Sequence, residues 1–268
     1  MIKRFGAWPA WAFMALFLAV PLGALVPEAA AGHGAAFVRI WRDAQFLNAL
    51  RNTLLLGGVS AVVSSVVGTL VAIELARQSP ARRQAMLALL GLPLAFSGLV
   101  IAYGFILAFG RAGFVTQLLS MAGGDAAEVG SWIYSVGGLA FAYAYYLIPR
   151  VALQLYPVFA NFDTAPTLAA RTLGATPAQA WWHTVVPVVA PAVAQSTFFV
   201  AAVAMGTYGT ALALVGTQLN ILPLMLLAKV GDGGNDFAGA AAMSLVLMLI
   251  CTVVLGVGDA LSNLTSKR

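Results

Sequence analysis

The residues of this chain that could do chemistry gather in two short interruptions of a strongly apolar sequence. The first interruption reads AMGTYGT from Ala204 to Thr210, inside a long uncharged stretch. Glycine and threonine at these positions permit a helix to unwind locally, so that freed carbonyls face a cavity. Thr207 and Tyr208 are therefore our candidates for lining a path through a membrane. The alternative is that the glycines only admit a neighbouring helix at close range.

The second interruption begins at Asp163 and reads DTAPTLAARTLGATPAQAWWHTVVPVVAP. Asp163 or Thr164 can cap a short helix, and Gly174 can end it, where a left-handed backbone is wanted. Thr176 can cap a second short helix, and Pro187 marks the entry into the next apolar segment. We expect a compact hairpin in water between two membrane helices, with small side chains over which a partner surface can seat closely.

This hairpin resembles the EAA loop of the inner-membrane permeases of binding-protein-dependent ABC importers. The family pattern is Glu-Ala-Ala, three residues, Gly, nine residues, Ile, one residue, Leu-Pro. Here Leu168-Ala169-Ala170 takes the triplet, Gly174 the glycine and Val186-Pro187 the final pair. Thr184 stands where isoleucine is usual. Leu168 replaces the family's glutamate, which argues against a salt bridge at that position but leaves the docking shape unchanged.

The resemblance implies a mechanical role and a set of partners. In the family, the short helix that begins near Ala165 sits in a cleft of a cytoplasmic ATPase subunit, and closure of two ATPases on ATP moves the membrane helices. A second permease, identical or different, and an external solute-binding protein complete the assembly, and the outer loop from Gly231 to Asp236 is a candidate contact for that protein. The residues expected to couple to the ATPase are Asp163, Leu168, Ala169, Ala170, Gly174 and Pro187.

Composition places the chain in a lipid bilayer. Of its 268 residues, 61% are hydrophobic and 9% are charged, whereas soluble domains carry about 25% charged residues. A helix needs about 20 apolar residues to cross the hydrocarbon core, and continuous apolar runs fit helices better than barrel strands. Uncharged runs of this kind cover residues 5–27, 52–73, 84–110, 129–149, about 187–215 and 237–258. We predict an all-α integral membrane protein with about six transmembrane helices, and the resemblance implies the MetI-like fold. One permease domain is expected over residues 1–268, with the coupling loop at about 160–190.

The distribution of lysine and arginine predicts the orientation in the membrane. With six spans, both termini fall in the cytoplasm of a bacterial cell with the chain in the inner membrane. Nine basic residues then lie inside and five outside. The inner set is Lys3, Arg4, Arg77, Arg82, Arg83, Arg150, Arg171, Lys267 and Arg268. The net charge of +5 therefore indicates contact with membrane lipid and not with nucleic acid. The first run is longer than the core of a signal peptide, so we expect it to be retained as a helix.

Three tyrosines precede Arg150, which we place at the cytoplasmic end of the fourth span. Tyr143, Tyr145 and Tyr146 can line a path, but an aromatic belt at the membrane surface is the preferred interpretation. Glu74 lies at the inner end of the second span, and no Asp or Glu falls in the middle of a predicted span, which weighs against proton-coupled transport.

The sequence contains none of the common catalytic motifs. No Ser-His-Asp set, carboxylate pair, His-Glu-x-x-His motif or Gly-x-x-x-x-Gly-Lys phosphate loop occurs, so we expect no cofactor, no metal and no ATP hydrolysis by this chain. A secondary transporter or channel without an ATPase is the alternative. We expect a small polar or charged solute, with a polyamine-like one as the first guess. The sequence does not fix the solute, because in the resembled family specificity lies largely in the binding protein.

Overall fold

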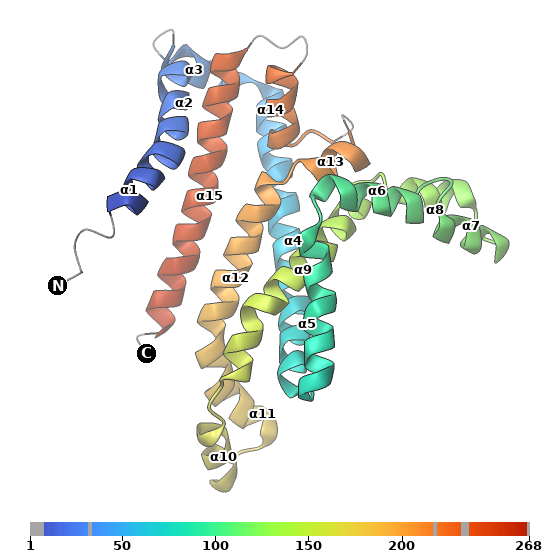
Figure 1. The fold of residues 1–268 in the computed structure, drawn as a ribbon, viewed down its shortest axis with the longest axis vertical. Coiled ribbons are helices and arrows are strands. Elements are labelled where there is room, and N and C mark those ends of the chain that lie inside the picture. Colours follow the sequence, from blue (N-terminus) through green and yellow to red (C-terminus); the bar gives the residue numbers. More distant parts are fainter. Residues whose placement is uncertain (1–7, 32–33, 217–218, 232–235, 267–268) are drawn as a thin grey trace. The chain divides into compact units, whose positions relative to one another are not determined.

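The computed structural model describes residues 8–31, 34–216, 219–231 and 236–266 (Figure 1). All regular elements in these ranges are helices, and six helical segments are long and apolar enough to cross a membrane. They are Trp8–Ala30, Ala44–Arg77, Gly98–Met121, Val136–Ala160, Pro177–Gly206 and Phe237–Asn263. The prediction of an all-α protein with about six transmembrane helices is confirmed. Lys3, Arg4, Lys267 and Arg268, on which part of the predicted orientation rests, lie outside the described residues.

The helices follow one another with short connections. In order they are α1 (Trp8–Met14), the π-helical turn η1 (Ala15–Ala19), α2 (Val20–Ala30), α3 (Ala35–Arg42), α4 (Ala44–Arg77), α5 (Pro80–Ala95), α6 (Gly98–Phe109), α7 (Phe114–Met121), α8 (Ala126–Trp132), α9 (Val136–Ala160), α10 (Ala165–Thr172), α11 (Pro177–Ala180), the π-helical turn η2 (Trp181–Val185), α12 (Val186–Gly206), α13 (Gly209–Leu214), α14 (Leu222–Val230) and α15 (Phe237–Ser266). The chain forms two compact units, residues 1–52 with 220–250 and residues 53–219 with 251–268. The single permease domain expected from the sequence stays a prediction.

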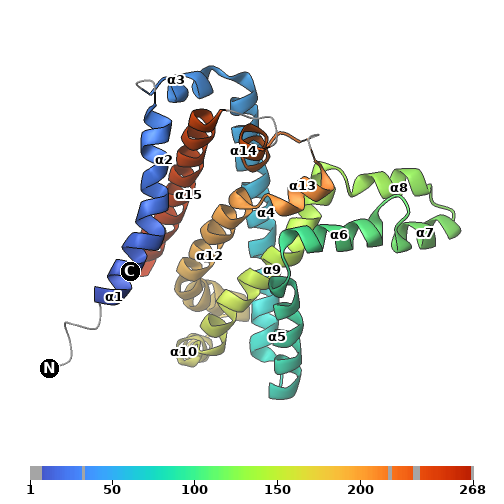
Figure 2. The same cartoon turned by 45° about the horizontal axis from the view of Figure 1, so that its top comes forward.

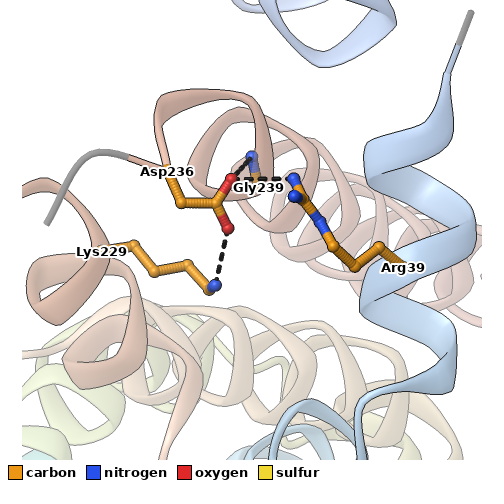
Figure 3. A network of polar contacts seen from close by, with 4 residues as sticks. All are labelled: Arg39, Lys229, Asp236 and Gly239. Atoms are coloured by element: carbon orange, nitrogen blue, oxygen red, sulfur yellow. Dashed lines mark hydrogen bonds and ion pairs between the residues drawn. The ribbon is translucent and has the colours of Figure 1, made fainter. Parts of the chain in front are cut away.

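The first unit has an apolar core and a polar network near its helix ends. The core joins Ala29, Ala36, Ile40, Phe46, Ala49, Leu222, Met225, Ala241, Ala242 and Met243. In the network, the Asp236 carboxylate accepts from Arg39 Nη2 and from Lys229 Nζ, each at 2.8 Å, and from the Gly239 amide at 3.0 Å (Figure 3). Asp236 therefore caps α15 and ties it to α3 and α14. Residues 232–235 of the loop proposed to contact a binding protein lie outside the described ranges.

The third apolar run is not one continuous helix. The sequence predicts a span over residues 84–110, whereas α5 ends at Ala95 and α6 begins at Gly98. Pro93 removes a backbone donor near the end of α5, and the Ser97 hydroxyl caps α6 by accepting from the Val100 amide at 3.5 Å. Beyond this break α6 leads away from α5 at a sharp angle (Figures 1 and 2).

The fourth span extends further than its uncharged run. The sequence ends it at Pro149, but α9 continues to Ala160 through Pro149 and Pro157. Arg150 therefore lies ten residues before the end of the helix, about 15 Å at the helical rise of about 1.5 Å per residue. The rule that proline and charge end a helix fails here, because a chain in lipid has no water to satisfy an interrupted backbone.

The fifth span begins earlier and ends earlier than predicted. The sequence places it at about Pro187 to Val215, but α11, η2 and α12 form one helical run from Pro177 to Gly206. The π turn keeps the run continuous at Pro187, because the Val186 amide donates to the Trp181 carbonyl one residue further back than in an α-helix. The hairpin and the membrane helix therefore share one rigid element.

Glycines bring the long helices of the second unit close together. A Cβ atom on Gly68 would lie 2.6 Å from Val151 Cβ, and one on Gly57 would lie 2.6 Å from Met205 Cγ. These contacts seat α4 against α9 and against α12, and α12 also packs on α9. Small residues in the spans thus serve close packing in lipid, as the composition suggested.

Candidate functional site

The backbone is unwound at Thr207, where glycine and threonine predicted it. Helix α12 ends at Gly206, and Thr207 is extended with φ −80° and ψ 121°. The Thr207 hydroxyl donates to the Val203 carbonyl at 2.8 Å. Its own carbonyl, freed by the break, accepts from the hydroxyl of the fully buried Tyr143 at 3.0 Å. A carbonyl that a helix would have used is thus turned toward α9.

A cavity of about 160 Å³ lies beside this break. Thr207 lines the cavity, whereas Tyr208 is not among its lining residues and has 47% of its surface exposed. The structure therefore separates the two residues that the sequence nominated together, and a path-facing role for either stays a prediction. The lining residues are Pro93, Leu94, Phe96, Gly98, Ile101, Tyr146, Arg150, Val203 and Thr207.

Two polar residues that were not nominated as site residues line the same cavity: Tyr146, which the sequence placed preferentially in an aromatic belt, and Arg150, which it placed at the cytoplasmic end of the span. Tyr146 is 7% exposed, and its hydroxyl makes no hydrogen bond although it lies near the side chains of Thr207 and Thr210. Arg150 follows one turn later on α9, and no hydrogen bond or ion pair joins it to any of the described residues. The spacing of four residues places both side chains on one face of a helix, and that spacing is the signal that could have found them.

Close contact between α6 and α13 fixes the rim of the cavity. The Thr210 hydroxyl donates to the Gly98 carbonyl at 3.1 Å. A Cβ atom on Gly98 would lie 2.5 Å from Thr210 Oγ1, and one on Gly209 would lie 3.3 Å from the Leu99 amide nitrogen. The helix break at Ser97 and the break at Thr207 are therefore held against each other.

The first helix of the hairpin has the caps that the sequence predicted. The Asp163 carboxylate accepts from the Ala165 amide at 2.9 Å, so Asp163 satisfies the first amide of α10, while the N-cap residue Thr164 makes no side-chain cap. At the other end Gly174 has φ +94°, and the Ala175 amide donates to the Ala170 carbonyl at 3.1 Å. This is a Schellman termination, which needs the left-handed backbone that glycine adopts most easily.

The second helix of the hairpin is tied to the first. Thr176 and Gln179 form a capping box at the start of α11. The hydroxyls of Thr167 on α10 and Thr184 on η2 lie 2.7 Å apart. Thr184 occupies the position where the resembled family has isoleucine, so the departure from the pattern is matched by a hydrogen-bonding partner. Side-chain hydrogen bonds therefore fix the start of α11 and connect α10 to η2.

The predicted coupling residues form an exposed surface on this hairpin. No side chain of α10 is buried, and Leu168 has 57% of its surface exposed. Ala169, Gly174 and Pro187 are exposed, while Ala170 is half-buried. An exposed leucine beside alanines is suited to contact with another protein, but the coupling role of these residues stays a prediction. The hairpin lies at the ends of α9 and α12 that are remote from α13 (Figure 1).

Comparison with known proteins supports one class. No family model matches the chain. The chain is 28% identical over 255 residues to "Sulfate permease 2, chloroplastic" of Chlamydomonas reinhardtii, covering 94% of this chain and 68% of the relative. It is 27% identical over 200 residues to "Molybdenum transport system permease protein ModB" of Mycobacterium bovis, covering 74% of each.

A solved structure shares the fold. The chain aligns with a chain of a bacterial alginate ABC transporter, crystallised in complex with an alginate pentasaccharide-bound periplasmic protein, with a TM-score of 0.76 and 18% identity. The match covers 95% of this chain and 91% of that one. Fold and sequence similarity together define the class: the chain is a multi-pass membrane permease of the ABC-importer type, as the hairpin resemblance predicted.

Proposed function

We propose that this permease forms part of the membrane path for a small tetrahedral oxyanion. The relatives are named for sulfate and for molybdenum, and sulfate and molybdate are both tetrahedral dianions. The polyamine-like first guess from the sequence alone is therefore replaced by an anion. The carrying observation is the similarity to a sulfate permease over 94% of the chain.

The assembly follows from the same class. Two cytoplasmic ATPases would dock on the exposed hairpin, a second permease or a copy of this chain would complete the path, and a solute-binding protein would deliver the anion from outside. Arg77, Arg82, Arg83 and Arg171 support an orientation with the hairpin and both termini in the cytoplasm of a bacterial cell. This chain would translocate the solute, and a separate subunit would hydrolyse ATP.

One helix joins the docking surface to the cavity. The run from Pro177 to Gly206 has 30 residues, which correspond to about 45 Å at about 1.5 Å per residue. It starts in the hairpin and ends at the break that carries Thr207. ATPase closure would push on α10, the bonded threonines would pass the push to η2, and α12 would move past α9 at the Tyr143–Thr207 hydrogen bond. A rigid element of this kind can carry coupling between distant sites.

A substitution at Gly174 tests the coupling role. Valine at φ +94° strains the Schellman turn, so Gly174→Val should leave ATP turnover in the assembled transporter but lower uptake at least tenfold. Gly91→Val is the matched control, because a Cβ atom at either glycine meets nothing within 4 Å and only Gly174 has a positive φ. Equal uptake by the two variants would contradict the proposed coupling.

Purification distinguishes this proposal from a secondary transporter or channel. The permease should retain a separate ATPase subunit through mild detergent extraction from its native membrane. A chain that transports the anion at full rate after ATP is removed would support the alternative.

A further inference from the structure

The cavity beside Thr207 contains a single charged residue, Arg150, within a transmembrane helix. A charged side chain at such a depth is expensive, and it typically marks a substrate path or pairs with another group. In the described part of the chain no carboxylate lies within ion-pair distance of Arg150. Arg150 is therefore left without a counter-ion among the described residues, and an anionic solute in the cavity would supply one.

We propose that Arg150, together with the hydroxyl of Tyr146, is the oxyanion contact of the membrane path. This inference rests on the proposed function and adds the residues that would recognise the anion. Both side chains project from one face of α9 into the same cavity. A guanidinium presents several N–H donors in a fixed plane, which suits two oxygen atoms of one oxyanion.

The hydroxyl of Tyr146 is a second observation that points to a solute, and it is independent of the charge of Arg150. A hydroxyl on a residue that is 7% exposed normally has a hydrogen-bond partner, yet this one has none. The neighbouring hydroxyl of Thr207 is already used, because it donates to the Val203 carbonyl at 2.8 Å. Tyr146 and Arg150 are thus the lining side chains with donors still available to a solute.

The size and charge of the cavity fit a small anion in transit. A volume of about 160 Å³ holds a few water molecules at about 30 Å³ each, and it is well below the roughly 300–1,000 Å³ of pockets that enclose larger ligands. One cation facing a dianion binds it without neutralising it fully. Such a site is strong enough to admit the anion and weak enough to release it.

The test uses the complete transporter, permease with its ATPase and binding protein, in liposomes loaded with ATP. Uptake of radiolabelled sulfate and of molybdate is measured for Arg150→Gln, Arg150→Lys and Arg82→Gln. Arg82 is exposed on α5, so its variant matches the change in charge away from the cavity. We expect Arg150→Gln to lower uptake at least tenfold with the ATPase still bound, Arg150→Lys to restore a large part of it, and Arg82→Gln to match the wild type.

A second pair of variants serves if Arg150→Gln does not assemble. Tyr146→Phe removes one hydroxyl from the cavity lining and keeps the ring, so it should preserve assembly and lower uptake about threefold. Tyr145→Phe, at the half-exposed neighbouring residue, should have no effect. Uptake by Tyr146→Phe equal to that by Tyr145→Phe, or uptake by Arg150→Gln equal to that by Arg82→Gln, overturns the inference.

The wild-type and variant measurements together separate this inference from the proposed function. A wild-type complex that carries sulfate or molybdate while Arg150→Gln matches Arg82→Gln overturns the oxyanion contact and leaves the proposed function intact. A wild-type complex that hydrolyses ATP in response to its binding protein but carries neither anion overturns the proposed oxyanion path, and with it the inference, and leaves only the importer assignment. A wild-type chain that never associates with an ATPase overturns the importer assignment, and with it the inference.

Discussion

The hairpin at residues 163–191 and the cavity at Thr207 lie at opposite ends of one helical run, and they are built in opposite ways. The hairpin is made by neighbours in sequence: Asp163 caps α10, Gly174 ends it and Thr176 caps α11. The cavity is made by segments that are far apart in sequence: the α5–α6 break with its flanking turns, α9, and the end of α12 with Thr207. A docking element for another protein can be formed by residues that are close in sequence, whereas a selective cavity requires packing between segments that are distant in sequence.

A bulky residue on the hairpin should have the largest effect. Ala169→Trp adds a large side chain to an exposed position of α10, so the fold should persist while the ATPase can no longer seat. We expect coupled uptake to fall more than tenfold and the ATPase to be lost on purification. Ala127→Trp makes the same change at an exposed position of α8, remote from the hairpin in Figure 1. ATPase retention by the Ala169 variant would remove the hairpin from the docking surface.

A methyl group at the cavity rim should have a smaller effect of another kind. Gly98→Ala would place Cβ 2.5 Å from Thr210 Oγ1, and overpacking of this kind costs about 1–3 kcal/mol. We expect a lower midpoint of thermal unfolding in detergent and uptake reduced several-fold, with the ATPase still bound. This result would separate damage to the cavity from damage to the docking surface.

Gly104→Ala is the control for that variant, because it lies on the same helix and a Cβ atom there meets nothing within 4 Å. Indistinguishable unfolding midpoints for the two alanine variants would show that α6 and α13 yield easily, and the rim would then not be rigid.

Predictability from sequence follows the same division between local and tertiary structure. The helical class, the six spans, the left-handed Gly174 and the unwinding at Gly206–Thr207 were predicted, because each depends on apolar length, capping or glycine within a few residues. The helix breaks and helix ends around Pro93, Pro149 and Pro187 were not predicted. Near Pro93 the helix ends and Ser97 caps the next one, whereas at Pro187 a π-helical turn keeps the helix continuous.

The polar lining of the cavity was the other part that sequence reasoning could not supply. Arg150 was read as a cytoplasmic charge because it follows an uncharged run, and Tyr146 was read as part of an aromatic belt. Their position became visible only once α9 continued to Ala160 and packed beside the Thr207 break. A charge count along the chain assigns a side of the membrane but has no information about depth within a longer helix.

A milder change within the hairpin should sharpen the comparison. Thr184→Ile restores the residue usual in the resembled family but removes the 2.7 Å contact with Thr167. A lost hydrogen bond of this kind costs about 1 kcal/mol, so we expect a slightly lower unfolding midpoint and a loss of uptake below threefold. The double variant Thr167→Val/Thr184→Ile should recover much of the stability, because it leaves no hydroxyl without its partner. Additive losses in this cycle would show that the two threonines do not brace the hairpin.

The smallest effect is expected in the first unit, which contributes neither to the hairpin nor to the cavity. The hydrogen bond from Lys229 holds the pKa of the Asp236 carboxyl below its usual value, with the Gly239 amide and the charge of Arg39 acting in the same direction. A depressed pKa in the folded protein gives stability that is present above the unfolded value of about 3.9 and is lost as the pH falls through the folded value. Asp236→Asn should therefore lower the unfolding midpoint modestly at pH 7 and remove part of the acid dependence below about pH 4, while uptake per assembled transporter at pH 7 stays unchanged. A large loss of uptake with an unchanged midpoint would give the Asp236 network a direct part in transport, and the hairpin and the cavity would then not account for transport alone.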